Sequence, residues 1–177
     1  GLGFGMLFWL GLGLPAVTGW TAFFIFAVAY ALAVGGLVAS TFHLGHPERA
    51  IKAFSQWRSS WLSREGVVSV ATLAVMGLYA LGAVFFASHW LVLGSIGAGL
   101  SLLTVFCTAM IYAQLDTVPR WKTPLTPLLF LVISIPGGPL LSGQVVAALT
   151  LLSLAVFPPA IWWFPRDAAF TWPGSRL

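Results

Sequence analysis

The length of its uncharged apolar runs constrains this chain more than any other feature. The first charged residue is Glu48, and only 7% of the 177 residues are charged, against roughly 25% in soluble domains. The run before Glu48 is about long enough for two membrane helices, since one span takes ~20 residues. A soluble enzyme domain and a disordered segment are therefore excluded. The lone Cys107 rules out an internal disulfide and a Cys-based zinc or iron–sulfur site.

The apolar runs predict an all-α, polytopic bundle of about five spans. We expect these spans at 2–14, 18–44, 66–87, 90–115 and 124–157. The first is about 20 Å of helix against a hydrocarbon core of ~30 Å, so it looks truncated. Residues 136–139, Pro-Gly-Gly-Pro, are expected to kink or break the fifth span. The small residues at 94–99 predict close helix packing on the fourth.

The polar segment 47–62 has the pattern of an amphipathic surface helix. Ala50, Phe54, Trp57 and Trp61 recur at the spacing of one helical face. Two interpretations stay open at this point: a linker at the lipid interface, or a docking surface for a soluble partner.

Three ionisable residues at span ends are the first candidates for chemistry. His43 closes the second span, Glu65 opens the third and Asp116 ends the fourth, so alternating spans place all three on one membrane face. His43 and Glu65 together suit proton-coupled quinone chemistry, because quinol oxidation releases two protons with two electrons. The alternatives are an interfacial His and a Glu that favours a helix N-terminus by ~0.3–1 kcal/mol. Asp116 can equally belong to a capped loop or to an ion pair with Arg120.

Two motifs resemble the DmsC family, the membrane anchor subunits of dimethyl sulfoxide reductase-like molybdopterin oxidoreductases. The first is Phe42-His-Leu-Gly-His-Pro-Glu-Arg-Ala50 followed by Ser59-Ser-Trp-Leu-Ser-Arg-Glu65. The second is Asp116-Thr-Val-Pro-Arg-Trp121, which is similar to the family's loop after its fourth span. The family has eight spans, so the resemblance implies that this chain is a fragment of an eight-span anchor.

The resemblance implies a subunit without a metal centre that exchanges electrons between the quinone pool and an iron–sulfur subunit, beside a molybdopterin catalytic subunit. The family's quinol-site His and Glu map onto His43 and Glu65, with Arg49 and Arg64 beside them as weaker candidates. The candidates for partner docking are Trp57, Arg58, Trp61, Asp116 and Arg120. Both S-oxide reduction and sulfite oxidation would use such a subunit, so substrate, quinone type and direction of electron flow stay open.

Two rival classes are weighed against this interpretation. A small transporter or channel could build its substrate site at a broken fifth helix, but no ionisable residue lies near that break. A b-haem carrier needs two axial His on facing helices. His43 and His46 share one segment, and His89 lies a span away, ~30 Å, so we expect no haem and no metal. Eight Lys and Arg are too few for a nucleic-acid partner.

Charge predicts the orientation. Loops 45–65 and 116–123 carry six bases, whereas the opposite face has Arg166 and Arg176. The positive-inside rule places these loops in the cytoplasm of a bacterial inner membrane. Family members that anchor a periplasmic reductase have the opposite orientation, so the charge count favours the sulfite dehydrogenase branch.

Overall fold

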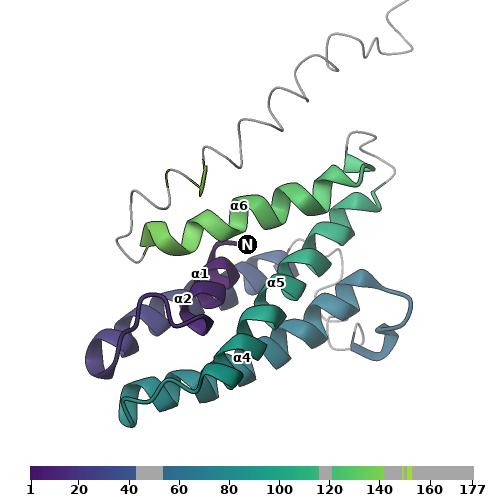
Figure 1. Cartoon of the computed structure of the whole chain (residues 1–177). Coiled ribbons are helices and arrows are strands. Elements are labelled where there is room, and N and C mark those ends of the chain that lie inside the picture. The colour runs from purple at the N-terminus through teal and green to yellow at the C-terminus, as the bar shows by residue number, and fades with distance from the viewer. Residues whose placement is uncertain (43–53, 116–120, 142–148, 150, 153–177) are drawn as a thin grey trace, which may run out of the picture.

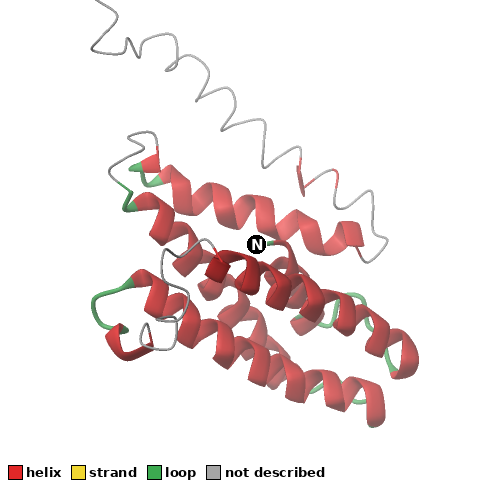
Figure 2. Cartoon of the chain, turned by 180° about the vertical axis from the view of Figure 1, so that it is seen from behind, coloured by secondary structure: helices red, strands yellow, loops and turns green. Residues whose placement is uncertain are grey.

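The computed structural model describes residues 1–42, 54–115, 121–141, 149 and 151–152 of the chain (Figure 1). Its elements are α1 (Leu2–Gly11), α2 (Gly19–Phe42), the 3₁₀ turn η2 (Phe54–Gln56), α4 (Trp61–Phe85), α5 (Leu91–Ala113) and α6 (Leu125–Leu141). The described part is helical and contains no strand (Figure 2). The expected all-α class is therefore confirmed.

Three of the helices are long and apolar enough to cross a membrane. These are α2, α4 and α5, with 24, 25 and 23 residues, and at 1.5 Å per residue each exceeds a hydrocarbon core of ~30 Å. Large apolar side chains cover their outward faces, as with Trp20, Phe85 and Val92, each more than 70% exposed. Lipid tails are the surroundings that suit such a surface, and the protein is a membrane protein.

The helix bounds differ from the expected spans mainly at the third span and in the fifth. The third helix begins at Trp61 rather than at residue 66, which moves Glu65 from a span boundary into the helix itself. The first helix ends at Gly11 rather than at residue 14. The fifth is described as one helix to Leu141, and most of the remainder expected to 157 lies outside the described residues.

Helix α1 lies in the middle of the bundle, in contact with α2, α5 and α6 (Figures 1 and 2). Two of its glycines let neighbouring backbones approach closely. A Cβ added at Gly5 would collide with the backbone of Ser134 on α6, and one added at Gly11 with the Gly94 carbonyl on α5. Small residues set the helix spacing here, as is usual between membrane helices. The packing role expected for Gly94 is therefore observed.

The expected break in the fifth span is not present in the described helix. α6 continues through Pro136 and Pro139 to Leu141. Pro139 has no N–H, so the carbonyl four residues earlier, that of Ile135, loses its helical donor. The indole Nε1 of Trp9 donates to this carbonyl at 2.6 Å. A side chain of α1 thus satisfies the carbonyl group that the proline leaves without a donor.

The described part of segment 47–62 is not one continuous surface helix. Residues 47–53 lie outside the described residues; η2 and a turn follow, and α4 starts at Trp61 after an extended Ser60 (φ −115°, ψ 125°). Trp57 and Trp61 consequently belong to different elements. Carbonyl groups of the turn are hydrogen-bonded by Arg64, and this contact favours the turn over a helix that would use those carbonyls internally.

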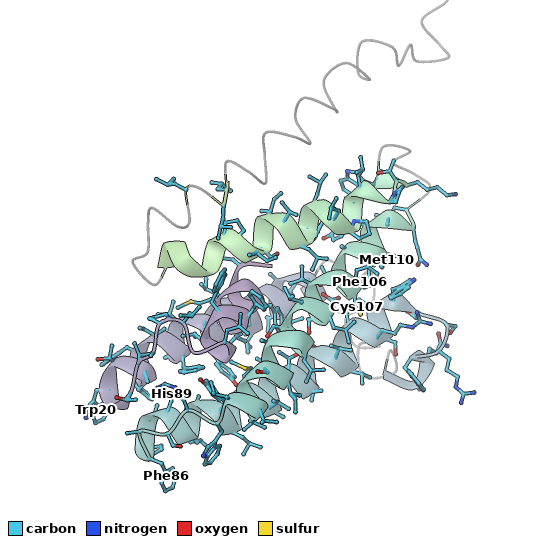
Figure 3. The ribbon with its side chains drawn as sticks, in the orientation of Figure 1. Trp20, Phe86, His89, Phe106, Cys107 and Met110 are labelled. Carbon is cyan, nitrogen blue, oxygen red and sulfur yellow. The ribbon has the colours of Figure 1, made fainter. Side chains whose placement is uncertain are left out.

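The bundle has two ends. We call the one where α4 begins and α5 finishes the Trp61 end, and the opposite one, where the turn between α4 and α5 lies, the His89 end. Figure 3 shows Trp20, Phe86 and His89 at the His89 end, and Phe106, Cys107 and Met110 toward the Trp61 end.

Candidate functional site

Glu65 is a buried carboxyl group near the Trp61 end. Its side chain is 6% exposed and lies within the first turns of α4. Thr108 on α5 donates a hydrogen bond from Oγ1 to Glu65 Oε1 at 2.6 Å. Carboxyl groups inside membrane helices are rare because their burial costs free energy, and they commonly mark functional sites. The structure therefore supports Glu65 as a candidate over the alternative of a solvated helix-terminal residue.

A row of hydroxyl groups continues from Glu65 into the bundle between α4 and α5. We call Glu65, Thr108, Thr104 and Thr72 the polar seam. Thr108 Oγ1 lies 3.0 Å from the carbonyl oxygen of Thr104, and the hydroxyls of Thr104 and Thr72 are 3.0 Å apart in the core. Both hydroxyls also donate within their own helix or are placed to do so, which is how Thr is usually tolerated there.

The sequence analysis missed the three threonines of the polar seam. A usable signal was present, since residues 65, 69 and 72 of α4 and 101, 104 and 108 of α5 are polar positions spaced for one helical face. All six side chains are buried or partly buried. Polar side chains on facing helices are a common source of interhelical hydrogen bonds in membranes.

Other groups surround Glu65 at close range. The amino group of Gly1 and the Cys107 thiol both interact electrostatically with its carboxyl group. The hydroxyl of Ser63, two residues before it, is buried and has no hydrogen-bond partner in the described part of the chain. No three His, Cys, Asp or Glu residues gather into a metal-binding group among the residues described.

Arg64 binds the loop that precedes α4. Its Nε donates to the Trp57 carbonyl at 2.9 Å and its Nη2 to the Arg58 carbonyl at 2.6 Å. The guanidinium also lies over the Trp61 ring, 4.3 Å from the centroid, a distance at which a cation–π contact is favourable. The structure thus shows Arg64 organising residues 57–61.

The docking candidates divide into exposed and packed residues. Trp57 is 56% exposed, and the guanidinium of Arg58 lies 5.9 Å from its ring. Trp61 instead packs edge-on against Phe106 of α5, with centroids 5.9 Å apart. Trp57 and Arg58 therefore form the accessible part of this loop.

Four sequence candidates lie outside the described residues: His43, Arg49, Asp116 and Arg120. The helix ends that flank them are described. α2 finishes at Phe42 and α5 at Ala113, both toward the end where α4 begins (Figure 1). Connectivity therefore brings residue 43 and residue 116 toward the same end of the bundle as Glu65.

The third histidine belongs to the opposite end. His89 Nδ1 lies 3.2 Å from the hydroxyl of Tyr79, and Tyr79 is 1% exposed against Phe26. This hydrogen bond satisfies a buried phenol group and links the turn after α4 to the core. Glu65 and His89 are therefore parts of separate sites.

Comparison with known proteins identifies the family. Residues 21–159 match the family described as DMSO reductase anchor subunit (DmsC). The C subunit of sulfite dehydrogenase from Allochromatium vinosum is 40% identical over 129 residues, covering 66% of this chain and 40% of that protein. The YnfH chain of anaerobic dimethyl sulfoxide reductase from Escherichia coli is 32% identical over 119 residues, covering 64% and 40%.

A further relative is the DmsC-type anchor of the anaerobic dimethyl sulfoxide reductase from Escherichia coli, 32% identical over 112 residues, with 60% of this chain and 38% of that protein covered. The sequence thus spans about 40% of the length of the curated relatives it matches. No solved structure matches it significantly. Because the family match extends over most of the sequence, this protein belongs to the DMSO reductase anchor subunit (DmsC) family.

Proposed function

We propose that this protein is part of the membrane anchor of a molybdopterin oxidoreductase complex and exchanges electrons between the quinone pool and an iron–sulfur subunit. The observation that carries the proposal is the buried Glu65 carboxyl group with its hydrogen bond from Thr108. Family membership and the printed names of the relatives support the anchor role. The inner membrane of a bacterium is the proposed location.

Quinol oxidation explains why a buried carboxyl group is useful here. Each quinol gives up two electrons and two protons as it becomes quinone. In the proposal the electrons pass to the iron–sulfur subunit, while Glu65 accepts or hydrogen-bonds one hydroxyl proton and His43 takes the other. Quinone reduction runs through the same groups in reverse, so the arrangement serves either direction of electron flow.

Two substitutions in the assembled, full-length complex test the proposal. His43→Ala and Glu65→Gln should each lower quinone-linked turnover about tenfold or more, within the range expected for loss of an acid–base group. The activity of the soluble subunits with an artificial donor should be unchanged, because that route bypasses the membrane subunit. Normal quinone-linked rates in both variants would contradict the proposal.

The sulfite dehydrogenase branch is the proposed assignment within the family. The Allochromatium vinosum relative named for sulfite dehydrogenase shares 40% identity, against 32% for the two dimethyl sulfoxide reductase relatives. The six bases of loops 45–65 and 116–123 favour a cytoplasmic position for the docking loops. The substrate would then be sulfite, with electrons delivered to quinone.

A transporter or channel is not proposed. That alternative depended on a broken fifth helix as its substrate site, and the described α6 continues through Pro136–Pro139. The Ile135 carbonyl, which such a site would leave accessible, accepts the Trp9 indole N–H.

A further inference from the structure

Thr108 holds two possible acceptors within reach of a single hydroxyl proton. Its Oγ1 lies 2.6 Å from Glu65 Oε1 and 3.0 Å from the Thr104 carbonyl oxygen. A hydroxyl group has one proton to donate and lone pairs with which to accept. Thr108 can therefore donate to one of the two oxygens at any moment, and the protonation state of Glu65 decides which.

We infer that Thr108 is a positioning residue that keeps Glu65 hydrogen-bonded both before and after the carboxyl group takes a proton from the quinol. This inference rests on the proposed function. With Glu65 ionised, Thr108 donates to Oε1. With Glu65 protonated, the carboxyl O–H donates to Thr108 Oγ1, and the Thr108 hydroxyl proton turns to the Thr104 carbonyl.

The exchange needs no other reactant. The proton that Glu65 gains comes from the quinol and leaves by the same carboxyl oxygen, while the Thr108 proton rotates about its own C–O bond and is never transferred. Both states keep the hydrogen bond between residues 65 and 108, so a buried carboxyl group is not left without a partner in either of them.

The surroundings of Glu65 make this contact the one that matters. Within the described part of the chain, Thr108 is the side chain that hydrogen-bonds Glu65. The titratable groups that interact with Glu65 electrostatically are the Gly1 amino group beside α1 and the Cys107 thiol on α5, which also senses Arg64. None of these can be both donor and acceptor to the carboxyl group in the manner of a hydroxyl at 2.6 Å.

The test compares Thr108→Val with Thr108→Ser in the assembled, full-length complex. Valine keeps the shape and removes the hydroxyl, whereas serine keeps it. We expect Thr108→Val to lower quinol-linked kcat about tenfold, the equivalent of one charge-assisted hydrogen bond, with KM for quinol within about twofold. Thr108→Ser should retain kcat within about twofold. If Thr108→Val fails to accumulate in membranes, Thr108→Ala removes the same hydroxyl without a branched side chain and carries the same expectation.

Ser101→Ala is the matched control. Ser101 is a fully buried hydroxyl on α5 that donates to the Gly97 carbonyl of its own helix. Its removal should leave kcat at the wild-type value. An equal loss of kcat in Ser101→Ala and Thr108→Val would mean that general packing of α5 is responsible and would overturn the inference.

Infrared difference spectroscopy of quinone reduction gives a second readout. The carboxyl band of Glu65 is identified by its absence in Glu65→Gln; it should move in Thr108→Val and stay in place in Thr108→Ser. A normal kcat and an unmoved band in Thr108→Val, while Glu65→Gln is impaired, would overturn this inference alone. A normal rate in Glu65→Gln would instead remove the proposed function on which it rests.

Discussion

Buried hydrogen-bonding groups in this membrane protein are paired across helices, residue by residue. Thr108 on α5 donates to Glu65 on α4, and Trp9 on α1 donates to the Ile135 carbonyl on α6. In hydrocarbon no water replaces a lost partner, so each unpaired polar group raises the free energy of the folded state. These pairs therefore specify which helices meet and at what height.

Trp9→Phe tests this at the α1–α6 contact. Phenylalanine keeps an aromatic ring but cannot donate to Ile135, whose helical donor is missing because of Pro139. We expect the free energy of unfolding to fall by about 1 kcal/mol, measured by denaturation of the full-length protein in mild detergent. Trp20→Phe is the control, since Trp20 is 76% exposed at the His89 end. Equal stability of the two variants would argue against the role given to the indole N–H.

At the scale of the helices, close backbone approach around α1 organises the bundle. Gly11 of α1 and Gly94 of α5 meet so closely that a Cβ at either would overlap the other's carbonyl oxygen. This contact fixes α5, and through α5 the position of Thr108 relative to α4. The packing of small residues is thus connected to the geometry around Glu65.

Gly94→Ala should therefore disturb the bundle far more than Gly99→Ala. A methyl group at residue 94 meets the Gly11 carbonyl and the Tyr79 ring, whereas one at residue 99 meets nothing within 4 Å. Overpacking of this kind typically costs about 1–3 kcal/mol, so Gly94→Ala should accumulate less in membranes and unfold more easily in detergent. Gly99→Ala should match the wild-type protein. A stable Gly94→Ala with unchanged quinone-linked rates would contradict this account of the packing.

At the scale of the whole molecule, one end of the bundle presents the surface on which partner subunits are expected to dock. Trp57 and Arg58 are exposed on a loop that Arg64 holds against the start of α4. We expect Trp57→Ala to reduce recovery of the iron–sulfur subunit with the purified anchor about tenfold, as for an aromatic interface anchor. Trp20→Ala, which removes an exposed Trp at the opposite end, should leave recovery unchanged. The opposite result would move the docking surface to the His89 end.

The orientation of that end is tested by a topology reporter inserted near Ser55 of the full-length protein. The positive charge of loops 45–65 and 116–123 predicts the cytoplasm, so an alkaline phosphatase fusion there should be inactive. An active fusion would place the loop outside and would favour a periplasmic S-oxide reductase over the sulfite dehydrogenase branch.

Much of this arrangement could be predicted from the sequence. Hydropathy located α2 and α5 closely, and the family resemblance carried by His43–Ala50 and Ser59–Glu65 is confirmed by the match over residues 21–159. The start of α4 was missed because Arg64 and Glu65 look like loop residues in a hydropathy pattern. The sequence also could not show that α6 passes through two prolines, because the compensating donor, Trp9, lies far away in the sequence.

The candidate site was only partly predictable for a related reason. Glu65 stands out as an ionisable residue beside an apolar run, but Thr108 is one of several hydroxyl residues in α5. Its importance depends on how α4 and α5 are rotated against each other, which one sequence does not specify. The contribution of His43, Arg49, Asp116 and Arg120 stays a prediction, since they lie outside the described residues.

The most direct test of the central claim is the binding of a fluorescent quinol analogue to the purified, full-length complex. Titration of the wild-type complex should show one saturable site, and Glu65→Gln should weaken its affinity about tenfold or more through loss of a charge-assisted hydrogen bond. Unchanged affinity in Glu65→Gln, or no saturable binding to the wild-type complex, would contradict a quinone site at Glu65.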